Sequence, residues 1–324
     1  MNALRSIVVG LDFTPASRQA LRQAARIAAL NDATLYALHV IEPSMIDDVL
    51  SLVGLGRDHS WNAVRDRARE LAKEVAWDGG AADARADVEA GSPFEVLSRA
   101  VKTRAADLLV LGVRSPVSIG RGPGPVATAC LRHAPTKVLL AREDHTGPYT
   151  SVVACTDFSE TSFRAIQAAV RVARQDKAAL RIVHVAMPLR PDMAYAGDPL
   201  GIWPGEPLEV MGLWNDYRAS LGPRLVKFVE PLGPEMSALD IKLDITEHEH
   251  YGRGIAAYAE EHKADLLVLG NLGRTNLRYA LLGSTAERAL AELPCSALVV
   301  KPAEIAAAPT EAAAPASGSG RWEM

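Results

Sequence analysis

The chain has 324 residues, of which 48% are hydrophobic and 23% are charged, and its formal net charge is −4. This length suits two domains of about 150 residues each, and the hydrophobic fraction excludes disorder for most of the chain. The mild acidity argues against a general binder of nucleic acid or of anionic membranes. No apolar run approaches the roughly 20 residues that span a bilayer, and the amino terminus lacks a signal peptide. We therefore expect a soluble, cytoplasmic protein.

The first 145 residues alternate short β-rich runs with amphipathic helical runs. Strands are expected over Ser6–Gly10, Thr34–Val40, Ala86–Glu89, Leu108–Leu111 and Lys137–Ala141. Helices are expected between them, over Pro15–Leu30, Ser60–Ala76, Pro93–Arg104 and Val126–His133. Thr14 and Pro15 form a good helix start, a hydroxyl cap followed by proline at the first helical position. Buried strands separated by amphipathic helices predict a parallel sheet that is covered on both faces.

The second part of the chain repeats the first. The segments 6–43 and 151–188 align without a gap, so that Asp12 matches Asp157 and His39 matches His184. The sequence ADLLVLG occurs twice, ending at Gly112 and at Gly270, and HAPTKVLLA from His133 is matched with LPCSALVVK from Leu293. The sequence thus predicts an α/β protein made of two tandem, doubly wound, five-stranded parallel-sheet domains, over residues 1–145 and 149–303.

Two segments depart from this repeat. The connection from Pro188 to about Pro207 is longer than its counterpart and rich in proline and glycine. We interpret it as an ordered surface loop or lid, with a plain insertion as the alternative. Residues 304–324 are rich in alanine, proline, glutamate, serine and glycine, and we expect them to be a disordered tail.

A glycine-rich segment of the second copy carries the chemistry. Gly270 and Gly273 are followed, after nine residues, by Gly283, Ser284 and Thr285, where a helix is expected to begin. Glycines in a loop can adopt positive φ angles and bring backbone N–H groups close to an anion. The N–H groups and the dipole of a helix start also favour phosphate. Ligands of such sheets lie beyond the carboxyl ends of the strands, where Asp157 is also expected.

These features resemble the universal stress protein family in its tandem form. The resemblance is carried by TDFSETS from Thr156, by His184-Val185, and by the G-x2-G-x9-G-S/T spacing of the family's ATP-binding branch. It implies a Rossmann-like, adenine nucleotide α-hydrolase-like fold that binds ATP (or ADP or AMP), with or without Mg. Asp157 and Val185 would then lie at the adenosine end, Gly270 and Gly273 along the ribose and phosphates, and Gly283, Ser284 and Thr285 on the phosphates.

A reading without a ligand remains open, because Ser284 and Glu287 would also form a capping box. The first copy departs from the pattern: Ser115 replaces the second glycine, and the loop ends in Gly124-Pro125. Proline removes an N–H donor and brings no hydroxyl. We expect this site to bind ATP weakly or not at all. The two alternatives are a site reshaped by Arg114 and Arg121 for another anion, and a vestigial site whose residues now serve only the fold.

No metal site and no catalytic residues are predicted. His248 and His250 would share one face of a strand, but no third ligand is apparent, and His39 and His184 are expected to be packed, hydrogen-bonded groups. No P-loop lysine motif and no GxSxG motif occurs. The three cysteines lie far apart, without the spacing of a zinc site or a disulfide framework.

Three functions follow as hypotheses. The leading one is a regulatory stress protein that binds partner proteins, as yet unknown, according to its ATP occupancy. The second is an enzyme, a slow ATP hydrolase or an autophosphorylating protein, and the third is an interaction module for another metabolite or a lipid. In the resembled family the last strands pair two domains, so we expect an internal pseudo-dimer and allow for a homodimer of chains.

Overall fold

The computed structural model describes residues 4–43, 57–114, 122–188, 207–273 and 282–302. The first half contains β1 (Ser6–Leu11), α1 (Pro15–Asn31), β2 (Thr34–Ile41), α3 (Arg57–Asp78), β3 (Arg85–Ala90), α4 (Pro93–Thr103), β4 (Leu108–Val113), α5 (Pro125–His133) and β5 (Lys137–Arg142). The second half contains β6 (Ser151–Cys155), α6 (Glu160–Asp176), β7 (Ala179–Ala186), α8 (Pro207–Val229), η1 (Glu230–Leu232), α9 (Gly233–Met236), β8 (Ile241–Glu247), α10 (Tyr251–Glu261), β9 (Leu266–Gly270), α11 (Ser284–Ala291) and β10 (Ser296–Val300). The loop from 189 to 206 and the tail from 303 lie outside the described residues.

The ten strands in the described part of the chain form one sheet, in the order β3-β2-β1-β4-β5-β10-β9-β6-β7-β8. Within each half the strands are parallel, as predicted. The halves meet where β5 pairs antiparallel with β10, with Leu139 opposite Leu298. The expected pairing of the last strands is therefore confirmed, and it joins the two predicted sheets into one. This pairing also places β5 and β10 in the middle of the sheet, so neither offers an open edge to a second chain.

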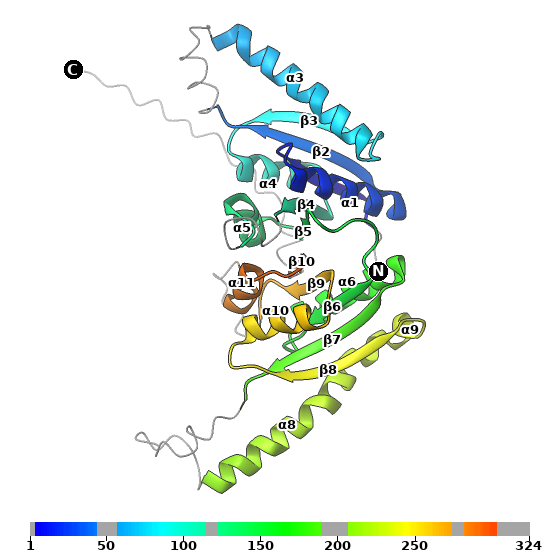
Figure 1. Ribbon diagram of the computed structural model, residues 1–324, viewed down its shortest axis with the longest axis vertical. Coiled ribbons are helices and arrows are strands. Elements are labelled where there is room, and N and C mark those ends of the chain that lie inside the picture. The colour runs from blue at the N-terminus through cyan, green and yellow to red at the C-terminus, as the bar shows by residue number, and fades with distance from the viewer. Residues whose placement is uncertain (1–3, 44–56, 115–121, 189–206, 274–281, 303–324) are drawn as a thin grey trace, which may run out of the picture.

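Helices cover both faces of the sheet (Figure 1). One face carries α1, α3, α6 and α8, and the other carries α4, α5, α10 and α11. The core between helices and sheet is built from fully buried strand residues, including Val8, Leu109, Val153 and Leu267. Such strands, buried on both faces, explain the nearly continuous apolar runs in the sequence.

The duplication extends to the details of the backbone. Thr14 caps α1 and Ser159 caps α6, each accepting a hydrogen bond from the backbone N–H three residues on. Phe13 and Phe158, which occupy matching positions, both adopt positive φ, at 62° and 65°. Residues other than glycine rarely do so, so the two turns share one unusual geometry.

One block of the sequence alignment is wrong by one residue. The strand registers pair Gly112 with Ala141 and Gly270 with Val300, so Arg142 corresponds to Lys301. The two cations play parallel roles: Arg142 donates to Pro294 O of the second half, and Lys301 donates to Leu131 O of the first.

Candidate functional site

All seven predicted site residues line a single cavity of about 370 Å³ in the second half. It lies at the carboxyl ends of β6 and β9, two neighbouring strands from which the chain winds in opposite directions. Ligand sites of open α/β sheets occur at such switch points, and the volume is within the usual range for small-molecule pockets. The predicted residues in its wall are Asp157, Val185, Gly270, Gly273, Gly283, Ser284 and Thr285.

Backbone hydrogen bonds hold the two ends of the glycine loop together beside this cavity. The Asn271 carbonyl accepts a hydrogen bond from Gly283 N–H at 2.7 Å, and Asn271 N–H donates to the Val300 carbonyl at 3.0 Å. Asn271 is fully buried. The loop therefore has a fixed base, although residues 274–281 lie outside the described part of the chain.

The three glycines lie in closely packed positions, and none has the positive φ that the sequence predicted. Gly283 has a φ of −68°, and neither Gly270 nor Gly273 is among the positive-φ glycines. A β-carbon on Gly273 would lie 2.8 Å from Asp157 Oδ2, closer than real contacts allow. A β-carbon on Gly270 would lie 2.9 Å from Thr161 Cγ2, so Gly270 allows α6 to pack against β9.

The helix start at Ser284 lies at the cavity. Gly283 is the N-cap of α11 and Ser284 is the first helical residue, and among the described residues no side chain caps this end of the helix. The Glu287 carboxylate instead pairs with Arg132 of the first half, at 2.5 Å. The capping-box interpretation is therefore wrong, because Ser284 is not the N-cap of this helix.

Apolar and hydroxyl side chains that are not among the seven predicted site residues complete the wall. Val183, Ile255 and Leu269 supply apolar surface, and Thr156 and Ser162 supply hydroxyls. Tyr251 lies at the rim and is 43% exposed. A pattern search misses Val183, Ile255 and Leu269 because they come from β7, α10 and β9, whose apolar positions resemble those of any core element.

The predictions for His184 and for His248 and His250 have different outcomes in the structure. Nδ1 of His184 lies 2.8 Å from the Thr156 carbonyl, so this side chain is hydrogen-bonded as predicted. His248 and His250 come after the end of β8 and not on it, and His248 Nδ1 accepts the His250 N–H at 2.9 Å. Their predicted position on one strand face is therefore wrong. Burial raises the pKa of the Cys155 thiol beside the cavity, which keeps it protonated.

The corresponding place in the first half is built differently. Helix α5 starts with Pro125, which has neither the N–H nor the hydroxyl of Ser284, and Gly124 has a φ of 87°. Asp12 Oδ1 accepts hydrogen bonds from Thr14 N–H at 3.0 Å and from Thr14 Oγ1 at 2.6 Å. Burial raises the pKa of Asp12, but bonds from Thr14 and Ser17 outweigh it and leave the pKa below its usual value. Arg114 is exposed, and Arg121 lies outside the described residues.

Comparison with known proteins identifies the family to which the chain belongs. The model of the universal stress protein family matches residues 3–142, 148–202 and 242–301. The chain belongs to the universal stress protein family. A universal stress protein of Mycolicibacterium smegmatis is 26% identical over 311 residues, which are 91% of this chain and 97% of that protein.

Solved structures show the same tandem fold. A functionally unknown protein from Pseudomonas aeruginosa PAO1 has a TM-score of 0.62 at 21% identity, covering 94% of this chain and 95% of its own. A universal stress protein from Archaeoglobus fulgidus has a TM-score of 0.60 at 20% identity, covering 91% and 96%. No helix among the described residues of this universal stress protein is long and apolar enough to span a membrane.

Proposed function

We propose that this universal stress protein is a cytoplasmic regulator that binds one adenine nucleotide, ATP or its di- or monophosphate, in the cavity of its second domain. The proposed domains are residues 1–145 and 149–303. The observation that carries the proposal is the gathering of a bare helix N-terminus, two closely approached glycines and one carboxylate around a cavity of suitable size. ATP occupancy would then set the affinity for protein partners.

The lining offers a place for each part of the nucleotide. Val183, Val185 and Ile255 provide apolar surface for the base, and Asp157 provides an acceptor for ribose hydroxyls. The first turn of α11 provides N–H groups and the hydroxyls of Ser284 and Thr285 for the phosphates. Mg, where present, would need phosphate oxygens as its main ligands, because Asp157 is the one carboxylate among the described residues that line the cavity. This favours binding over hydrolysis.

The first experiment identifies the ligand. Purified protein is denatured by heat, and the released nucleotide is identified by chromatography. Titration calorimetry with ATP should then give about one site per chain. A value near two would contradict the asymmetry between Pro125 and Ser284, and the absence of any binding would contradict the proposal.

The second experiment locates the site with matched variants. Gly283→Val places a β-carbon 3.3 Å from the Asn271 carbonyl, on the wall of the cavity, and should weaken ATP binding more than tenfold. Tenfold corresponds to about 1.4 kcal/mol. Gly124→Val, the matching change in the first half, should leave ATP affinity unchanged. The melting temperature of each variant is also measured, so that a loss of affinity can be distinguished from a loss of stability. Ser284→Ala should lower affinity without the stability loss of a lost cap, because Ser284 does not cap α11.

A further inference from the structure

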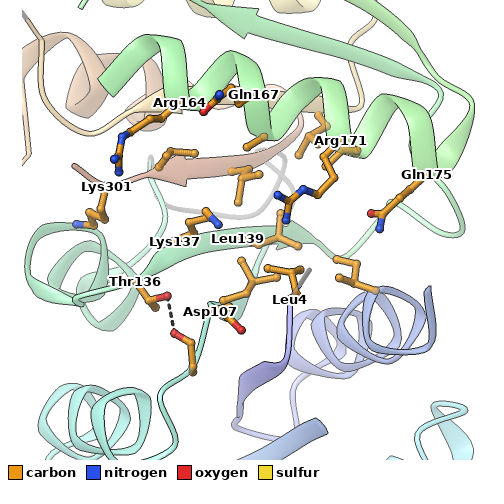
Figure 2. Close-up of a pocket in the computed structure, with 18 of the residues that line it drawn as sticks. Leu4, Asp107, Thr136, Lys137, Leu139, Arg164, Gln167, Arg171, Gln175 and Lys301 are labelled. Carbon is orange, nitrogen blue, oxygen red and sulfur yellow. Dashed lines mark hydrogen bonds between the residues drawn. The ribbon is translucent and has the colours of Figure 1, made fainter. Parts of the chain in front are cut away.

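The cavity of the second half and a larger one between the halves differ in the aromatic rings of their walls. The larger cavity, of about 670 Å³, is shown in Figure 2. The aromatic residue of its described lining, Tyr149, is 1% exposed, and its ring already stacks on that of His145, with 4.7 Å between the centroids. In the wall of the second-half cavity, by contrast, Tyr251 is 43% exposed. An open aromatic ring thus lies at the cavity to which the proposed function assigns the nucleotide.

Tyr251 has no partner for its ring or its hydroxyl among the described residues. Its hydroxyl makes no hydrogen bond with them, and neither an aromatic ring nor a cation of the described part of the chain packs on its ring. A single exposed aromatic residue is ordinary on a protein surface. What distinguishes Tyr251 is its position, because it is the first residue of α10 and lies at the rim of the cavity.

Tyr251 is on the side of the cavity where the wall is apolar. Ile255 lies one helical turn after Tyr251, so the two side chains share a face of α10, and both line the cavity. The first turn of α10 also packs against β7, because a β-carbon on Gly254 would lie 2.9 Å from Val185 Cγ1. Val185 is itself a lining residue. Tyr251 therefore extends the surface that the proposed function assigns to the base.

A glycine next to Tyr251 allows this end of α10 to lie close to α11. A β-carbon on Gly252 would lie 2.7 Å from the Thr285 carbonyl oxygen, closer than real contacts allow. In the first half the corresponding residue is Phe94, whose ring packs edge-on against His133 at the end of α5, at 5.6 Å. The second half thus has glycine in place of the packed aromatic residue, and it places an aromatic ring one position earlier, in the cavity wall.

We propose that Tyr251 stacks on the base of the bound nucleotide and makes the cavity selective for purines over pyrimidines. This inference rests on the proposed function of the same cavity. An aromatic side chain can stack on any base, and the two fused rings of a purine cover more of it than the single ring of a pyrimidine does. Val185 and Ile255 contact the base beside the ring. Tyr251 acts through the surface of its ring, so its hydroxyl is not needed.

Calorimetric titration with ATP and with UTP tests the proposal. Tyr251→Ala should weaken ATP binding about tenfold, which is within the range for loss of a base-stacking side chain, and should weaken UTP binding several-fold less. Tyr251→Phe keeps the ring and should bind ATP as the unsubstituted chain does. Tyr217→Ala is the control, because Tyr217 is 37% exposed on α8, outside the cavity lining, and it should change neither affinity. A merely structural role of Tyr251 would lower both affinities by the same factor.

A photochemical label on the unsubstituted chain covers the case in which a variant fails to fold. On irradiation, 2-azido-ATP should attach to the peptide that contains Tyr251, and excess ATP should prevent this labelling. The role of Tyr251 is overturned, while the nucleotide site stands, if ATP binds and the label lies only on other segments. The same holds if Tyr251→Ala leaves ATP affinity unchanged or lowers the affinities for ATP and UTP equally. If the unsubstituted chain binds no ATP, the proposed function is wrong and this inference with it.

Discussion

Two glycines of this protein act through packing and not through backbone freedom. Gly112 and Gly270 end the repeated ADLLVLG, and each lies under the first helix of its half. A β-carbon on Gly112 would lie 2.3 Å from the backbone of Ala16 and 2.5 Å from Ser17 N. Backbone atoms cannot turn away as a side chain can. This packing gives Gly112 a structural role in the first half, where the G-x2-G-x9-G-S/T spacing is absent.

Gly112→Ala should therefore destabilise the fold strongly, by about 3 kcal/mol, the upper end of the usual cost of overpacking. Urea unfolding, followed by circular dichroism, measures this free energy. Gly212→Ala is the control, because nothing lies within 4 Å of a β-carbon at that position of α8. It should stabilise the helix by about 0.5–1 kcal/mol. Equal stability of the two variants would show that α1 does not depend on the close approach.

Lys301 makes stability depend on pH. Burial lowers its pKa from 10.5 to about 8, with the nearby Cys130 acting in the opposite direction. Below pH 8 the lysine is protonated in both the folded and the unfolded chain. Between about pH 8 and 10.5 the unfolded chain still binds the proton while the folded chain has lost it, so this group increases stability as pH rises.

The variant Lys301→Met should lack that increase. From pH 7 to pH 9.5 the unsubstituted chain should gain about 1–2 kcal/mol relative to the variant. The measurement is the difference in unfolding free energy between the two chains at each pH. The thiols and tyrosines titrate in both chains, so their contributions to this difference cancel. A constant difference across this range would mean that the Lys301 pKa is not lowered. The comparison does not depend on which chain is more stable at pH 7.

At the scale of elements, most of the fold could be predicted from the sequence. The strand expected over Thr34–Val40 is β2 (Thr34–Ile41), and the helix expected over Pro15–Leu30 is α1 (Pro15–Asn31). Apolar runs of fixed length and a Thr-Pro helix start carry this information locally. The seven predicted site residues also meet in one cavity, because strand order and loop position determine where they lie.

The features that the sequence did not predict depend on contacts between residues that are far apart in the chain. The last strands, VLLA and ALVV, are uniformly apolar, so the alignment slipped by one residue and missed the match of Arg142 with Lys301. The role of Gly273 depends on the position of Asp157, more than a hundred residues earlier in the chain.

At the scale of the whole molecule, the two halves share their cores. One core cluster joins Val138 and Leu140 of β5 to Ala297 and Val299 of β10, and the other joins Leu139 to Leu298 across the opposite face. The ion pairs Arg26–Asp176 and Arg132–Glu287 also link first-half helices to second-half helices. Because the sheet and both core clusters continue across the junction, we expect the two halves to unfold together.

Scanning calorimetry should accordingly show a single transition, with equal calorimetric and van't Hoff enthalpies. Val299 is fully buried opposite Val138, so Val299→Lys places a charge between the halves without a partner, at a cost of several kcal/mol. The transition should move to lower temperature and separate into two as the halves lose their coupling. Val226→Lys is the control, because Val226 is 58% exposed on α8, and its transition should be unchanged. Two transitions in the unsubstituted chain would show that each half is stable alone and that the pairing of β5 with β10 only tethers them.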